Sequence, residues 1–166
     1  MYREKIIAND KAHLKRIIER EMLIFGNECD LNHIDISLVT DLSKLFHKLE
    51  FNGDISRWNV SHVVHMDNMF ESSVFNGDIS NWDTSHVKSM HGMFLNNEHF
   101  TGRIDFWNTS KVINMSFMFC NSNFNGDLSR WDVSHVIYMD SMFEDSIFNQ
   151  DIGSWNVKNV TTMFLM

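Results

Sequence analysis

The chain has 166 residues, of which 43% are hydrophobic and 22% charged, so it can bury a core and differs from a disordered polar chain. Its 14 Lys and Arg against 22 Asp and Glu give a formal net charge of −8, which argues against direct nucleic-acid binding because that requires a basic face. No stretch reaches the ~18 apolar residues of a membrane span, and the first residues contain no apolar signal-peptide core, so we expect a cytoplasmic protein without a membrane partner.

The first predicted element is an amphipathic helix near the N-terminus. Asp10 is a suitable N-cap, and Gly26 would end the helix after about Phe25. Leu14 and Ile17 lie on its apolar face together with Ile18, Met22 and Phe25. We expect residues 1–28 to form a helical cap over the repeats that follow.

Residues 29–166 consist of repeated units, which determines the expected architecture. Sequences related to Phe-Asn-Gly-Asp recur at spacings of 24, 25, 24 and 24 residues, starting at Phe51, Phe75, Phe100, Phe124 and Phe148. All five tryptophans occupy one repeat position: Trp58, Trp82, Trp107, Trp131 and Trp155. A degenerate unit around Leu31 precedes these, and the last unit is incomplete, which makes six units in total.

Each unit carries two hydrophobic periods. Trp58 and Val60 alternate with polar residues, which predicts a short half-buried strand. Val63, Met66 and Met69 follow at spacings of three, which predicts one face of a helical turn capped by a serine. Strands from successive units would pair in parallel, and the Asx residue after each tryptophan would hydrogen-bond from unit to unit.

The repeated pattern Phe-Asn-Gly-Asp-Ile-Ser-x-Trp-Asx-Val/Thr-Ser-x-Val-x-x-Met-x-x-Met-Phe resembles the BspA-like leucine-rich repeat family, the bacterial surface protein repeat. The resemblance covers about residues 30–166. It implies a bacterial solenoid protein and, for secreted members, adhesion to host or matrix proteins. It implies no catalytic residues and no cofactor. The expected fold is therefore an α/β repeat solenoid, a leucine-rich-repeat-like stack of ~24-residue units with short parallel strands and an N-terminal capping helix.

Catalytic and metal chemistry are weaker interpretations of the repeats. Ser61 and His62 are copied in other units near an Asx residue, whereas a catalytic triad needs one asymmetric arrangement. His62 and His86 share a column but lack zinc-ligand spacing. The turn acids resemble calcium-binding turns only partly, because Arg103 interrupts their column. We therefore predict no enzyme activity, no cofactor and no metal site.

The favoured function is protein–protein interaction on the concave face of the solenoid. The unit that starts at Phe100 departs most from the pattern, and Phe106 places an aromatic residue on the face that is otherwise polar. An exposed aromatic residue near arginines has the composition of a binding hot spot. The predicted partner-binding residues are Arg57, Asn59, Asn81, Asp83, Phe106, Asn108, Arg130 and Asp132.

Two other functions remain open at this stage. One is a fragment of a secreted or surface adhesin, which would place the protein outside the cell. The other is a phage- or mobile-element-encoded inhibitor of a host nuclease or defence protein. As a separate prediction, the incomplete last unit would leave an open sheet edge through which two copies could form a homodimer. This predicted oligomer edge consists of Trp155, Val157, Val160 and Met163.

Overall fold

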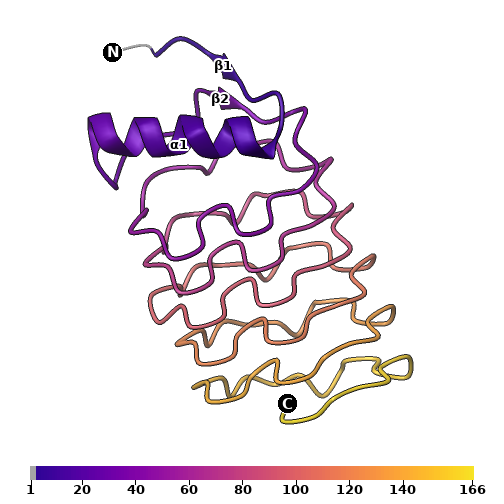
Figure 1. Ribbon diagram of the computed structural model, residues 1–166. Helices are drawn as coiled ribbons and strands as arrows, with labels where there is room; N and C mark the ends of the chain where they lie inside the picture. The colour runs from indigo at the N-terminus through magenta and orange to yellow at the C-terminus, as the bar shows by residue number, and fades with distance from the viewer. Residues whose placement is uncertain (1–2) are drawn as a thin grey trace.

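The computed structural model describes residues 3–166, and its regular secondary structure lies near the N-terminus (Figure 1). The elements are strand β1 (Ile6–Ile7), helix α1 (Lys11–Phe25) and strand β2 (Ile34–Asp35). Strands β1 and β2 pair in parallel, with Ile6 opposite Ile34 and Ile7 opposite Asp35. The described part of the chain contains no further helix or named strand.

The predicted N-terminal helix is confirmed, with both of its end signals. The carboxylate of Asp10 accepts a hydrogen bond from the backbone N–H of His13 at 2.7 Å, which satisfies one free donor of the first turn. At the other end Gly26 adopts a φ of 84°, and its N–H donates to the carbonyl of Met22. Helix α1 lies at the N-terminal end of the repeats (Figure 1), where Leu14 and Ile18 are fully buried.

The predicted α/β leucine-rich-repeat solenoid is wrong. The repeats contain neither the predicted strands nor the predicted helical turns, because from β2 onward the described chain consists of turns, extended segments and single bridges. The units run as turn-rich layers, one beside the next (Figure 1). Six isolated parallel bridges connect chain segments one unit apart, five of them in a single column that runs through Asp41, His65, Ser89, Asn114, Tyr138 and Thr162.

Left-handed backbone conformations explain why the methionine-rich segment forms no helix. In the second unit Asn68 has a φ of 55° and Ser72 a φ of 52°, and a residue of this kind every four positions interrupts an α-helix. The N–H of Asn68 donates to the carbonyl of His91 in the next unit at 2.7 Å. The N–H of Met69 instead donates three residues back, to Met66. The backbone N–H groups of this segment thus alternate between acceptors in their own unit and acceptors in the next unit.

A tight turn replaces the strand that was predicted around each tryptophan. The backbone N–H of Trp58 donates to the carbonyl of Ile55, three residues earlier, at 3.1 Å. The same turn occurs at Trp82, Trp107, Trp131 and Trp155. These amides are therefore used within their own unit and cannot form a ladder with a neighbouring strand.

Stacked phenylalanines form the core that connects the layers. Phe94 and Phe100 stack with ring centroids 4.1 Å apart. Phe94 also stacks on Phe70 at 5.6 Å and on Phe119 at 5.7 Å, in the units before and after. One unit cannot bury these rings by itself, so the layers stabilise each other.

Phe117 is the bulkiest side chain in a left-handed conformation, with a φ of 60°. The equivalent positions of neighbouring units hold Asn68, Gly92 and Ser141, residues that tolerate this conformation better than an aromatic residue does. We expect Phe117→Asn to raise the free energy of unfolding by about 0.5–1 kcal/mol, because it relieves backbone strain. Urea unfolding measures this, with Phe117→Ala as the control that keeps the strain and loses the ring. Equal destabilisation by both variants would show instead that the contact of the ring with His91 dominates.

Candidate functional site

The eight predicted partner-binding residues all lie on the surface of the repeats. Each is exposed, and each stands directly before or directly after a buried tryptophan. Phe106, for example, is 63% exposed, whereas its neighbour Trp107 is 3% exposed. We call this set the exposed strip: Arg57, Asn59, Asn81, Asp83, Phe106, Asn108, Arg130 and Asp132.

The buried tryptophans hold the exposed strip in place. The indole Nε1–H of Trp58 donates to the carbonyl of Leu31 at 3.0 Å, and that of Trp107 donates to Ile79 at 3.1 Å. The same bond to the preceding unit is made by Trp82, Trp131 and Trp155. Each indole thus satisfies its only donor while its ring stays buried. The positions on either side of it have little freedom to move.

The Asx residues of the exposed strip form turns within their own units, and the predicted hydrogen bonds from unit to unit are absent from these side chains in the described structure. Asn59 Oδ1 accepts from the backbone N–H of Ser61 at 3.1 Å, and Asp83 Oδ1 accepts from Ser85 at 3.0 Å. Hydrogen bonds from the side chain and the backbone of Ser85 lower the pKa of Asp83. Ser134 lowers the pKa of Asp132 in the same way. The exposed strip therefore carries fixed negative charges at neutral pH.

Two guanidinium groups lie close to the ring of Phe106 in the middle of the exposed strip. The Cζ atom of Arg130 is 4.8 Å from the ring centroid, and that of Arg103 is 5.6 Å from it. Arg103 also forms an ion pair with Asp105 at 3.3 Å. The cluster presents a large apolar surface bordered by hydrogen-bond donors, which is a composition enriched at protein interfaces.

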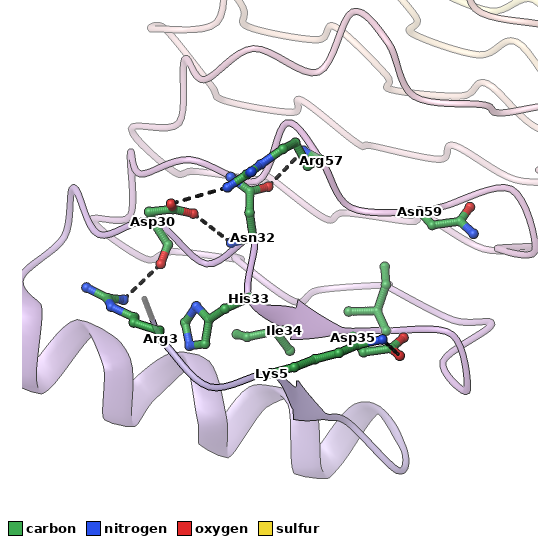
Figure 2. Close-up of a pocket in the computed structure, with 10 residues that line it drawn as sticks. Arg3, Lys5, Asp30, Asn32, His33, Ile34, Asp35, Arg57 and Asn59 are labelled. Carbon is green, nitrogen blue, oxygen red and sulfur yellow. Dashed lines mark hydrogen bonds and ion pairs between the residues drawn. The ribbon is translucent and has the colours of Figure 1, made fainter. Parts of the chain in front are cut away.

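A groove of about 780 Å³ lies at the N-terminal end of the exposed strip (Figure 2). Figure 2 shows side chains from three segments around it: the N-terminal segment, the stretch that contains β2, and the second unit. Two residues of the exposed strip, Arg57 and Asn59, line this groove. The exposed strip and the groove are therefore parts of one continuous surface.

Ion pairs organise the charged side chains of the groove. Lys5 Nζ lies 2.7 Å from Asp35 Oδ2, and the hydrogen bond from Lys5, together with those from Ser37, lowers the pKa of Asp35 to about 2. Arg57 lies 3.6 Å from Asp30, and its backbone N–H donates to Asn32 Oδ1 at 2.7 Å. The groove thus presents alternating positive and negative groups.

A buried carboxylate fastens the N-terminal segment beside the groove. Glu21 is 3% exposed, and its oxygens lie 3.1 Å from Arg3, 2.9 Å from Arg20 and 3.4 Å from His33. Arg3 also donates to the carbonyl of Asp30 at 2.9 Å. Since a buried carboxylate is costly without partners, this cluster connects the N-terminal segment, α1 and the first unit.

Sequence reasoning did not find Arg3, Lys5 or His33 as residues of a surface site. The apolar run Ile6-Ile7-Ala8 was the available signal, because it is compatible with a short strand. Nothing in the sequence indicates that this strand pairs with β2, and that pairing is what brings Lys5 to Asp35.

The residues predicted for the oligomer edge differ in their exposure. Trp155 is 9% exposed and belongs to the core, and Val160 is partly buried against it. Val157 is 39% and Met163 is 42% exposed. The structure therefore brings only part of this set to the surface.

The acids that resembled calcium-binding turns make hydrogen bonds within their turns. Asp54, Asp78 and Asp127 each accept from the backbone N–H two residues ahead, at 2.8–2.9 Å. Among residues 3–166 no group of three or more His, Cys, Asp or Glu side chains is arranged to hold a metal ion. In the same range, no helix has the length and apolar character needed to cross a membrane.

Comparison with known proteins adds one finding. Residues 20–122 and 96–166 match the model of a protein family described as "Mycoplasma protein of unknown function, DUF285". No curated protein and no solved structure matches the chain.

Proposed function

Since the chain belongs to the DUF285 family of Mycoplasma proteins, whose description names no function, we propose from its surface that it is a non-enzymatic module that binds a protein partner on the exposed strip. The observation that carries this proposal is Phe106, a large aromatic side chain that is 63% exposed and has two guanidinium groups close to its ring. Hot spots of protein interfaces are enriched in aromatic residues and arginine.

The support of Phe106 favours a preformed binding surface. Trp107 directly follows it and is buried with its indole bonded to Ile79 O, so the backbone beneath Phe106 is anchored. The adjacent Trp131 makes the same bond to Ile104 O and anchors Arg130. A surface that is ordered before binding loses less conformational entropy when the partner docks.

The groove extends this surface toward the N-terminal segment. Arg57 and Asn59 belong to both, so a partner on Phe106 can continue along the exposed strip into the groove. The ion pairs of Lys5 with Asp35 and of Arg57 with Asp30 leave charged edges that face the groove. Such edges contribute to orientation and specificity more than to affinity.

We expect the Phe106→Ala/Arg130→Ala double variant to weaken binding of the partner by about thirtyfold or more, which corresponds to ~2 kcal/mol. A photo-reactive amino acid at position 106 first captures the partner from native lysate, and titration with the purified partner then measures the affinity of each variant.

Tyr138→Ala is the matched control, because this aromatic residue is 46% exposed and belongs to the bridge column outside the exposed strip. Loss of affinity in the double variant with none in the control supports the proposal. Equal affinity of the double variant and the wild type would refute it. The captured partner also separates the remaining interpretations: a host surface protein supports an adhesin, and a nuclease or defence protein bound with steep salt dependence supports an inhibitor.

A further inference from the structure

The two arginines beside Phe106 differ in how their guanidinium groups are used. Arg103 forms a two-point pair with the carboxylate of Asp105, in which its Nε donates to Oδ1 and its Nη2 to Oδ2, both at 3.3 Å. These hydrogen bonds raise the pKa of Arg103. Next to Phe106 the chain thus already contains an arginine that holds a carboxylate with two parallel donors.

Arg130 carries the same group without a carboxylate. Within residues 3–166 its guanidinium forms no ion pair and no hydrogen bond, whereas the other arginines of the repeats, Arg57 and Arg103, each have an aspartate. The aspartates closest to it in the sequence, Asp127 and Asp132, instead accept the backbone N–H two residues ahead, at 2.8 and 2.9 Å. Both carboxylates are held in their own turns, so the donors of Arg130 remain available.

Phe106 restricts the position of the Arg130 side chain. The Cζ atom of Arg130 lies over the ring, 4.8 Å from its centroid. A guanidinium above an aromatic ring uses its face for that contact, and its five N–H donors remain at its edges. The backbone of both residues is anchored by the neighbouring indoles of Trp107 and Trp131. A donor group that is ordered before binding loses less entropy when a ligand docks.

We propose that Arg130 binds the carboxylate of an aspartate or glutamate side chain of the partner, while an apolar side chain next to that acid packs on Phe106. This inference rests on the proposed function, since it names the chemistry of a partner bound on the exposed strip. The match is one of charge and shape, because a carboxylate accepts two parallel hydrogen bonds from one guanidinium, as Asp105 does from Arg103.

Fixed negative charges on the exposed strip limit the partner to an isolated acid. Hydrogen bonds from serines lower the pKa of Asp83 and of Asp132, so both carboxylates are ionised at neutral pH. A run of acidic residues in the partner would face these carboxylates, and like charges repel across an interface. The fitting segment therefore has one acid, with apolar, uncharged or basic residues around it.

A peptide library selected on the full chain tests the proposal. Random dodecapeptides are displayed on phage through their C-termini, so that they present no free C-terminal carboxylate. We expect the enriched peptides to contain one Asp or Glu next to an apolar residue. Synthetic copies with amidated C-termini are then titrated against the wild type and its variants. Arg130→Gln should weaken binding by about tenfold or more, and so should replacement of the peptide's acid by its amide. Because both changes remove the same pair, the two together should cost little more than either one.

Arg16→Gln is the matched control, because Arg16 is exposed on α1 and its loss changes the net charge equally. Affinity kept in Arg16→Gln and lost in Arg130→Gln supports the proposal. Peptides that Phe106→Ala weakens and Arg130→Gln does not would overturn the carboxylate contact and leave the proposed function intact, as would losses that add in full. A selection that enriches nothing, or only peptides indifferent to Phe106→Ala, would count against the exposed strip itself and so against both proposals. Circular dichroism establishes that each variant is folded.

Discussion

Gly53→Ala is expected to lower the free energy of unfolding by about 3 kcal/mol, the upper range for overpacking in a core. A Cβ atom at Gly53 would lie 2.0 Å from the carbonyl oxygen of Cys29 and 2.8 Å from the ring of Phe51. The first of these atoms is backbone of the preceding unit. It cannot rotate away, because it also accepts the N–H of Asp54 at 3.2 Å. The added methyl group therefore has to separate two layers.

Gly153→Ala is the matched control for this prediction. The nearest atom to its added Cβ is the side-chain Oδ1 of Asp151 at 3.1 Å, and Gly153 itself is exposed. We expect a change within about 0.5 kcal/mol. Urea unfolding of both variants measures the difference. Equal stability of the two would mean that the close approach of Gly53 to Cys29 does not exist in solution.

Phe100→Ala should have the largest effect on stability, a loss of about 3–5 kcal/mol. The ring is fully buried and stacks on Phe94 at 4.1 Å, on Phe124 at 6.0 Å and on Phe75 at 6.4 Å. Its removal leaves a cavity in the middle of the core and takes a stacking partner from three other rings. Stability then falls by both the lost burial and the cavity.

Phe106→Ala provides the comparison, since the same substitution six residues later removes a ring that is 63% exposed. We expect it to change stability by no more than about 0.5 kcal/mol. Thermal unfolding followed by tryptophan fluorescence separates the two variants. Similar losses at both positions would contradict the assignment of Phe106 to the surface and of Phe100 to the core, and with it the basis of the proposed binding site.

The structure changes how the repeated pattern is understood. Apolar residues three positions apart, such as Val63, Met66 and Met69, are compatible both with one face of a helix and with a series of turns. The turns form because Asn68 adopts a left-handed conformation and directs its N–H to the next unit. Hydrophobic spacing alone does not report where a backbone donor points, so the sequence could not distinguish the two.

The candidate site was predictable in part. The position of Phe106 beside a repeated tryptophan indicated an exposed aromatic residue, and the structure places it on the surface. The groove was not predictable, because it depends on the pairing of β1 with β2, and this pairing connects residues 28 positions apart. Lys5 and Arg57 approach the same groove only after both segments have folded against the first unit.

The sequence by itself determined the repeat period, most of the buried apolar positions of the repeats, and the bounds of α1. Local chemistry is sufficient for these features, since Asp10 and Gly26 act on adjacent backbone and burial follows apolar character. Only the tertiary structure decided the conformation of each unit and the location of the groove. In these units many of the backbone hydrogen bonds and phenylalanine stacking partners come from the neighbouring layers, so a unit reaches its full conformation only with its neighbours in place.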